Sequence, residues 1–172
     1  IIQGGNLQTM AKSTGLLLIE LSSIFSSINP DYVITVADRH ETLATAIAAS
    51  YMNIPLIHTQ GGELTGSIDE SVRHAITKLS HIHFPATITA KRNIIQMGEN
   101  PKNIFLTGCP SIDLVKKYKK NKKKFYPKNF NNLGVGHQIE LNKKYLVVMY
   151  HPVTNEYGKN KKTIKNLLRT IK

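Results

Sequence analysis

Ionisable side chains and glycines gather in one short stretch, IHTQGGELTGSIDESVRH at residues 57–74, at the end of the apolar segment NIPLIH. Carboxylates and imidazoles are the groups that most often transfer protons in enzymes. The three glycines either only permit tight turning or let the backbone approach a ligand and leave N–H groups free for an anion. The stretch lacks the spacing GxGxxG and the lysine of a P-loop, so the standard dinucleotide and nucleoside-triphosphate fingerprints are absent.

Other polar residues each have a structural explanation beside a chemical one. The run DRHE at 38–41 is typical of a helix start with local ion pairs. His81 and His83 share one strand face, but no carboxylate or cysteine lies at metal-ligand spacing beside them, which favours structural or solvent-facing histidines. We expect Cys109 to be a small buried residue rather than a nucleophile. His151 follows an apolar strand, a position suited to acid–base work.

Alternating strands and helices must position these residues. Residues 7–28 have apolar positions at helical spacing and stop at Asn29-Pro30, because the residue before proline is pushed out of the α region. Asp69 is suited to cap a helix that begins inside the polar stretch. The expected elements, in chain order, are a helix at 7–28, a strand at 31–38, a helix at 41–53, a strand at 54–59, a helix from 69, a strand at 81–86, a helix at 89–98, a strand at 103–108, a helix at 110–118, a strand at 144–152 and a helix at 161–172.

The expected strands are apolar runs that alternate with helices. This pattern predicts an open, parallel α/β sheet covered on both faces. In such sheets ligands bind outside the carboxyl ends of the strands. The polar clusters ADRHE, HTQGGELTGSIDE, GCPSID and YHPVTNE each follow a predicted strand. Four strand ends therefore supply polar side chains to one rim.

The net charge of +12 belongs to one part of the chain. Residues 1–113 carry 7 Lys and Arg against 9 Asp and Glu, whereas residues 114–172 carry 16 against 2. Eight lysines fall in KKYKKNKKKFYPK at 116–128, which is typical of a solvated linker, with a phosphate-contacting patch as the alternative. The single cysteine excludes an internal disulfide framework and fits a reducing cytoplasm. No run reaches the ~18 apolar residues of a membrane span.

The motifs ADRHETLA, HTQGGELTGSIDESVRHAITKLSHIH, GCPSID and YHPVTNE resemble, in this order, the hydrolysing UDP-N-acetylglucosamine 2-epimerases of sialic acid and related nonulosonic acid biosynthesis. The resemblance implies a Rossmann-like parallel sheet, part of a two-domain GT-B architecture truncated at both ends, with the nucleotide sugar in the cleft. Residues 1–115 would form the C-terminal part of the first Rossmann-like domain, 116–143 a Lys/Asn-rich linker or loop, and 144–172 the start of the second Rossmann-like domain.

The resemblance also implies catalytic residues. Asp38 matches the family's acid–base aspartate, with Arg39 beside it as a substrate-binding residue. Asp69 matches the second essential carboxylate, and we expect Arg73 to bind substrate and to anchor Asp69. His151 matches a further catalytic position. Such a set suits the removal of a proton from C2 of a sugar and the proton transfers of water addition.

Three more residues are expected to contact the substrate. Glu63 and Asp113 match binding positions of the family by resemblance. Gln60 stands where many relatives have a glutamate in the pattern HxEGGE. Glutamine keeps the hydrogen bonding of glutamate and loses its capacity to transfer a proton. Gln60 therefore indicates a different nucleotide sugar, a changed division of labour or reduced activity.

The reaction implied is elimination of UDP from UDP-N-acetylglucosamine to a glycal intermediate, followed by rehydration to N-acetylmannosamine, with neither NAD nor a metal as cofactor. The alternatives are the same chemistry on a UDP-2,4-diacetamido sugar of the legionaminic acid route, a non-hydrolysing 2-epimerase, and a basic nucleic-acid-binding module. The expected partners are the nucleotide sugar and further copies of the chain, without nucleic acid or membrane. We expect the 172 residues alone to be inactive, because most of the UDP-binding half would lie beyond Lys172.

Overall fold

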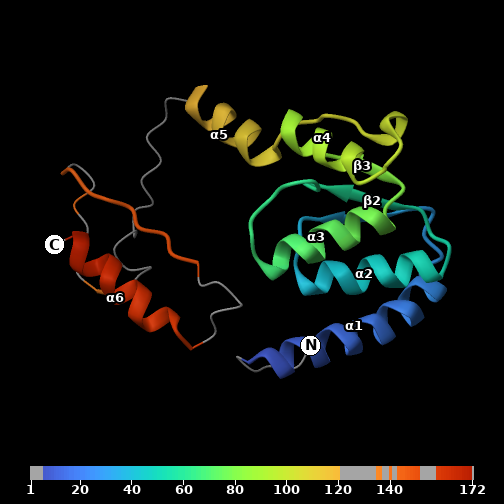
Figure 1. Ribbon diagram of the computed structural model, residues 1–172, viewed down its shortest axis with the longest axis horizontal. Coiled ribbons are helices and arrows are strands. Elements are labelled where there is room, and N and C mark those ends of the chain that lie inside the picture. Colours follow the sequence, from blue (N-terminus) through green and yellow to red (C-terminus); the bar gives the residue numbers. More distant parts are fainter. Residues whose placement is uncertain (1–5, 121–134, 137–139, 141–142, 152–157, 172) are drawn as a thin grey trace. The chain divides into compact units, whose positions relative to one another are not determined.

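The computed structural model describes residues 6–120, 135–136, 140, 143–151 and 158–171. The chain divides into two compact units, one made of residues 1–110 and 152–172 and the other of residues 111–151. The first unit contains a three-stranded parallel sheet in the order β1-β2-β3, with helices packed along it (Figure 1). The predicted α/β class with a parallel sheet is confirmed.

The sheet consists of short strands that end at a common edge. They are β1 (Val33–Val36), β2 (Leu56–Thr59) and β3 (Ile82–Phe84). The register places Val36 opposite Thr59, so β1 and β2 finish together. The predicted strand at 103–108 is reduced to a parallel bridge between His83 and Ile104, continued by a bond from Phe105 N to His83 O at 2.9 Å. This edge segment makes too few ladder bonds to count as a strand.

The helices lie close to their predicted positions. Helix α1 covers the predicted range, with Asn6 capping its start by accepting from Thr9 N at 2.8 Å and Asn29 ending it at φ 48°. The next three helices each begin one residue before the expected start. The helical elements are α1 (Leu7–Ile28), α2 (His40–Tyr51), α3 (Ile68–Leu79), α4 (Ile88–Gln96), the 3-10 turn η1 (Pro101–Asn103), α5 (Pro110–Lys120) and α6 (Asn160–Ile171).

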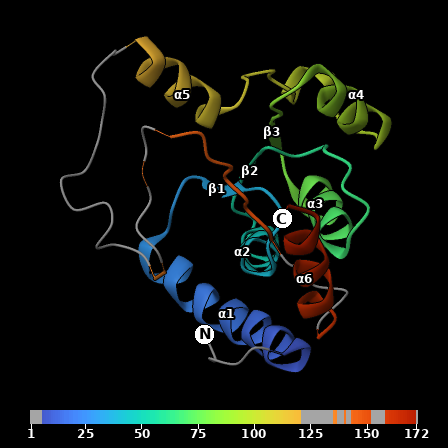
Figure 2. The same cartoon turned by 90° about the vertical axis from the view of Figure 1, so that its left-hand side faces the viewer.

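Helices cover one face of the sheet. Each strand is followed along the chain by its neighbour in the sheet, and parallel crossovers are right-handed, so the helices between the strands fall on the same side. Figure 1 and Figure 2 show α2 and α3 packed together on that side. On the other face of β1, Ile34 and Val36 are 63% and 55% exposed. The expectation of cover on both faces is therefore wrong for β1 in the described part of this chain.

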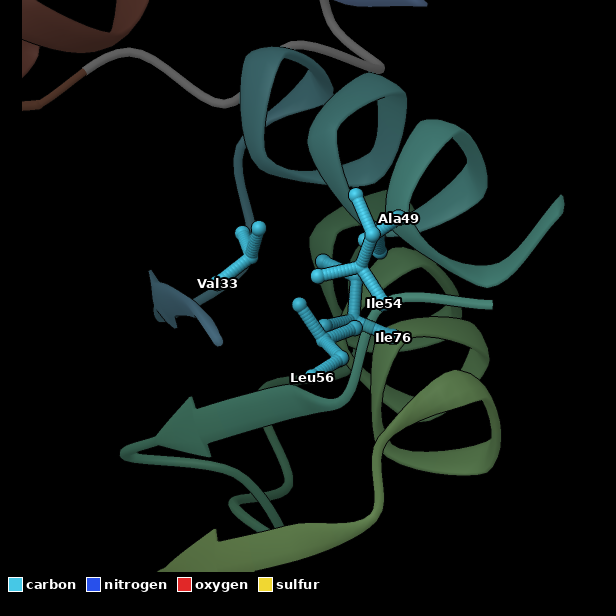
Figure 3. Close-up of a cluster of buried hydrophobic side chains, with 6 residues drawn as sticks. Val33, Ala49, Ile54, Leu56 and Ile76 are labelled. Carbon is cyan, nitrogen blue, oxygen red and sulfur yellow. The ribbon is translucent and has the colours of Figure 1, made fainter. Parts of the chain in front are cut away.

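The core lies between β1, β2 and the helices α2 and α3. Its central side chains come from all four elements (Figure 3), and alanines on α2 let that helix approach the sheet closely. Leu56 and Ile76 are fully buried. The buried members of the core are Val33, Ala46, Ala49, Ile54, Leu56 and Ile76.

The second unit differs more from the prediction. Helix α5 begins at Pro110 as expected but continues to Lys120, into the range assigned to the linker. Residues 143–151 contain neither helix nor strand, although a strand was expected at 144–152, and Leu146, Val147 and Met149 are each 77% exposed. A strand needs a partner for its backbone groups, and residues 143–151 pair with no strand in the described part of the chain. The remainder of the predicted linker lies largely outside the described residues, and the predicted domain boundaries stay predictions.

None of the helices that the structure describes is both long and apolar enough to cross a membrane.

Candidate active site at the ends of β1 and β2

The chain turns sharply after β1 and after β2. Ala37 and Gln60, which directly follow the two strands, have φ values of 61° and 60°. This left-handed conformation costs a residue with a side chain roughly 1–2 kcal/mol. A backbone bond holds each turn, from Ala37 N to Thr59 O and from Gln60 N to Phe84 O, both at 3.0 Å. The turns place Asp38 and Gln60 at the predicted rim of the sheet, where such strain is common in functional sites.

Arg73 of α3 holds the carboxylate of Asp38. Its Nη2 donates to Asp38 Oδ2, and its Nη1 donates to Glu63 O at 2.7 Å and to Thr65 Oγ1 at 3.5 Å. The side chains of Arg73 and Asp38 are 5% and 21% exposed. A charge buried to this degree needs its partner, because the lone charge would be poorly solvated. Arg73 therefore fixes the direction of the carboxylate and ties the loop after β2 to it.

His58 connects the end of β1 to α3. It is fully buried, and its Nε2 lies 2.8 Å from Ala37 O. A carbonyl can only accept, so Nε2 carries the proton and donates it. On the other side of the ring, Nδ1 lies 3.2 Å from Thr77 Oγ1, which in turn lies 3.0 Å from Arg73 O. The imidazole thus bridges the residue before Asp38 and the helix that carries Arg73.

Burial keeps this imidazole neutral. It lowers the pKa of His58 to about 4, since the charged form would lose its hydration, and the positive charge of Arg73 acts in the same direction. The bond to Ala37 O and the nearby Asp38 favour the charged form but do not outweigh burial. At neutral pH His58 is therefore a neutral donor with one fixed tautomer.

Arg39 lies beside the carboxylates but is bound to its own helix. Its Nε and Nη2 donate to the two oxygens of Glu41 at 3.1 and 3.0 Å, which is the local ion pair expected at this helix start. The bond to Glu41 raises the pKa of Arg39, and the negative charges of Asp69 and Asp38 contribute as well. Arg39 thus lies in the field of both candidate catalytic carboxylates, with its side chain 72% exposed.

Two expectations about Asp69 are wrong. Helix α3 begins at Ile68 after Ser67, so Asp69 lies inside the first turn, where its Oδ2 accepts from Ser67 Oγ at 3.3 Å. Arg73 pairs with Asp38 rather than with Asp69. The spacing of four residues allows an Asp69–Arg73 pair on one helix face, but Arg73 is buried towards the sheet, where Asp38 is its partner. Asp69 lies at the N-terminus of α3, where the helix dipole stabilises a negative charge.

Two of the three glycines of the stretch, Gly61 and Gly62, serve packing. A Cβ on Gly61 would lie 2.7 Å from His58 Nδ1, and a Cβ on Gly62 would lie 2.3 Å from Ala90 O of α4. Asn93 of α4 donates to Gly62 O at 2.7 Å and so fastens the loop. Of the two explanations open from the sequence, tight turning with close packing describes Gly61 and Gly62. The residues His58, Thr77 and Asn93 were missed as parts of the site; only the position of His58 on the face of Leu56 hinted at its burial.

Gln60 faces the segment that follows Ile104. Its Nε2 lies 4.0 Å from Cys109 Sγ, a weak contact that brings two of the predicted strand ends together. Both residues are half-buried rather than fully buried. Glu63, three residues along the loop, contributes its backbone oxygen to Arg73, and its side chain is half-buried.

The paired histidines are structural. His81 accepts a bond from Leu56 N at 3.2 Å, and the buried His83 lies with its Nε2 3.5 Å from Glu99 Oε2. Burial lowers the pKa of His83. Among the residues that the structure describes, no group of His, Cys, Asp and Glu is arranged to hold a metal ion.

Asp113 and His151 lie in the second unit, on α5 and at the end of the segment 143–151, and both are exposed. Their membership of the site stays a prediction. The first unit brings together Asp38, Arg73 and Glu63, with Arg39 and Asp69 nearby and Gln60 on the same rim.

The family model described as UDP-N-acetylglucosamine 2-epimerase matches residues 2–172. The chain belongs to this 2-epimerase family. It is 41% identical over 148 residues to the Legionella pneumophila protein named UDP-N,N'-diacetylbacillosamine 2-epimerase (hydrolyzing), a match that covers 86% of the chain and 37% of that protein. It is 34% identical over 159 residues to the UDP-N-acetylglucosamine 2-epimerase of Neisseria meningitidis, covering 90% of the chain and 38% of that protein.

A solved 2-epimerase has the same fold over most of the chain. The Methanocaldococcus jannaschii UDP-GlcNAc 2-epimerase, in complex with UDP-GlcNAc and UDP, matches with a TM-score of 0.64 and 26% identity over 72% of this chain and 34% of that one. The epimerase family inferred from the motifs is confirmed. The chain spans less than two fifths of the length of both curated relatives named above.

Proposed function

We propose that the complete protein is a hydrolysing 2-epimerase, which eliminates UDP from a UDP-linked 2-acetamido sugar and adds water to release the free 2-epimer. The observation that carries the proposal is the Asp38–Arg73 pair at the carboxyl ends of β1 and β2, in a chain of the 2-epimerase family. A half-buried carboxylate with a fixed direction at a sheet rim is the group that proton transfer at a sugar carbon needs.

The side chains divide the work by position. Asp38 and Asp69 are the two carboxylates for removing the C2 proton and for the proton transfers of water addition. For Arg39, which is exposed and in the field of both, we propose the stabilisation of the negative charge that develops on the departing diphosphate. His151 is the proposed third proton-transfer group.

The remaining candidates bind rather than react. Gln60 offers an amide at the rim for hydrogen bonds to the sugar, and Arg73 orients Asp38. Glu63 and Asp113 are proposed as further contacts to the nucleotide sugar. Gln60 is unable to transfer a proton, so Asp38, Asp69 and His151 carry all of the acid–base steps in this proposal.

The relatives favour a particular substrate. Identity is 41% to the relative named for UDP-N,N'-diacetylbacillosamine and 34% to the relative named for UDP-N-acetylglucosamine. We therefore take the UDP-2,4-diacetamido sugar as the first substrate to test and UDP-N-acetylglucosamine as the second, which reverses the order expected from the motifs. Products of wild type and Gln60→Glu on both sugars, followed by NMR, distinguish the two substrates.

The deciding experiment compares Asp38→Asn with a matched carboxylate at the other end of β1. Asp31 is exposed and precedes the strand, so Asp31→Asn leaves the rim intact. We expect Asp38→Asn to lose about 10²- to 10⁴-fold in kcat, since the amide is unable to accept the proton, and Asp31→Asn to keep wild-type kcat. Release of UDP together with free 2-epimer supports the hydrolysing reaction, whereas a UDP-linked epimer without free sugar overturns it.

A further inference from the structure

We propose that His58 is a positioning residue for Asp38: its imidazole sets the turn after β1 that aims the carboxylate, without touching the sugar. The inference rests on the proposed function and names a residue that the reaction itself does not use. It stands on hydrogen bonds, burial and backbone conformation in the first unit.

The contacts around His58 form a closed ring. His58 Nε2 donates to Ala37 O at 2.8 Å, and Ala37 directly precedes Asp38. Asp38 accepts from Arg73, and Arg73 O lies 3.0 Å from Thr77 Oγ1 one helical turn later. Thr77 Oγ1 also lies 3.2 Å from His58 Nδ1, which is an acceptor in this tautomer, so the one hydroxyl proton is shared between Nδ1 and Arg73 O. The direction of the Asp38 carboxylate and the place of its guanidinium partner therefore depend on the same imidazole.

The backbone of Ala37 explains why this ring is needed. Its φ of 61° is unfavourable for a residue with a Cβ, so the turn requires bonds on both sides of the residue. Ala37 N donates to Thr59 O, and Ala37 O accepts from His58. A side chain without a donor at position 58 would leave Ala37 O without its hydrogen bond from His58. The loss is costly because His58 is fully buried. The turn would then relax and carry Asp38 with it.

The surroundings of His58 are built for an imidazole. Gly61 approaches the ring so closely that a Cβ there would lie 2.7 Å from Nδ1 and 2.9 Å from Cε1. The ring is fully buried, so it has no route to a bound sugar. Its influence on the reaction can reach the substrate only through Asp38 and Arg73, which defines a positioning role.

Three variants of the full-length protein test the inference. His58→Leu fills the site without a donor, and His58→Gln keeps a donor at the reach of Nε2. Leu56→Ala is the matched control, because Leu56 lies two residues earlier on the same face of β2 and is also fully buried, yet has no bond to the turn. Thermal unfolding ranks the stability loss of each variant. The turnover of the UDP-2,4-diacetamido sugar and of UDP-N-acetylglucosamine gives kcat and KM.

We expect His58→Leu to lose about 100-fold in kcat, the size that a misplacement of about 1 Å produces, with little change in KM. His58→Gln should recover most of this loss, and Leu56→Ala should keep kcat near wild type despite a comparable loss of stability. If His58→Leu does not fold, Thr77→Val decides, since it removes the hydroxyl beside Nδ1; a lower kcat at unchanged KM supports the inference.

The inference is overturned if His58→Leu, or Thr77→Val in its place, keeps wild-type kcat, or if Leu56→Ala loses as much kcat as His58→Leu. A loss confined to KM also overturns it, because a misaimed base slows the reaction rather than weakening binding. If the wild-type protein consumes neither sugar, the proposed function itself is refuted. Turnover by the wild-type protein is therefore measured before any variant is compared.

Discussion

Asp38 owes its position to residues from three elements. Arg73 of α3 pairs with it, Ala37 after β1 turns the chain in front of it, and His58 of β2 holds that turn. Asp38 and Arg73 were both predicted as residues of the site, but the ion pair between them was not predicted. Asp38 and Arg73 are 35 residues apart, and only the burial of one face of α3 decides which carboxylate Arg73 meets.

The titration of His58 predicts how stability depends on pH. Burial lowers its pKa from 6.5 to about 4, so the unfolded chain binds a proton that the folded chain refuses. This contribution to stability is complete above pH 6.5 and is lost as the pH falls towards 4. A pKa shift of one unit corresponds to about 1.4 kcal/mol, so the shift of His58 contributes about 3 kcal/mol to the free energy of unfolding. Buried His83 acts in the same direction.

Urea unfolding of the complete protein between pH 7 and pH 4 measures this effect. Wild type should lose stability on acidification more steeply than His58→Leu, which has no imidazole to titrate at this position. The ionisable groups that influence the pKa of His58 are His83, Arg73 and Asp38. His83→Leu is therefore the matched comparison and should flatten the curve as well. Equal slopes for wild type and His58→Leu would contradict the burial of a neutral imidazole.

At the scale of elements, the loop from Gln60 to Ser67 is fastened at both ends. Asn93 of α4 and the close contact of Gly62 with Ala90 O hold its start, and Arg73 holds Glu63 O. Glu70 accepts from the N–H groups of Thr65 and Gly66 at 2.5 and 2.6 Å, which lowers the pKa of its carboxyl group. The loop is thus tied to the scaffold of the site, while its tip at residues 64–66 is exposed.

Two glycines of this loop form a matched pair. Gly62 and Gly66 both have positive φ, at 81° and 70°, but only Gly62 is crowded, since a Cβ at Gly66 meets nothing within 4 Å. Gly66→Ala should cost about 1 kcal/mol for the backbone alone. Gly62→Ala should cost about 3 kcal/mol or more, because overpacking against Ala90 and Ile94 adds to that. Urea unfolding checks both values, and equal losses would show that α4 yields to the extra methyl group.

The order of elements was predictable because each carries a local signal. Apolar runs mark β1, β2 and β3, and prolines and glycines mark helix ends at Asn29-Pro30, Gly98 and Pro110. The ranges 103–108 and 144–152 carry the same apolar signal, yet neither forms a strand in the described residues. A strand depends on neighbours that supply hydrogen bonds, and that information lies outside the segment itself.

At the scale of the whole molecule, acidic and basic residues are unevenly distributed along the chain. Residues 1–113 hold the candidate rim with 9 Asp and Glu against 7 Lys and Arg, while residues 114–172 hold 16 Lys and Arg against 2 Glu. Eight of these lysines form the run at 116–128, which is typical of a solvated linker, with a phosphate-contacting patch as the alternative. The two possibilities differ in how binding depends on salt and on the lysines at 116–128.

Replacing the eight lysines of 116–128 by glutamine separates these possibilities in the complete protein. We expect the wild type to bind single-stranded DNA only non-specifically, with affinity falling steeply between about 50 and 200 mM salt, and the variant to lose this binding. Turnover of the UDP sugar should stay at the wild-type value, because the proposed catalytic groups Asp38, Asp69 and His151 all lie outside this run. The aromatic residues near the run, Tyr118, Phe125, Tyr126 and Phe130, do not alternate with the lysines as a base-stacking surface would require. DNA binding that persists at high salt would return the nucleic-acid-binding alternative to consideration, whereas a variant that loses turnover would assign the lysine run a part in the reaction of the UDP sugar.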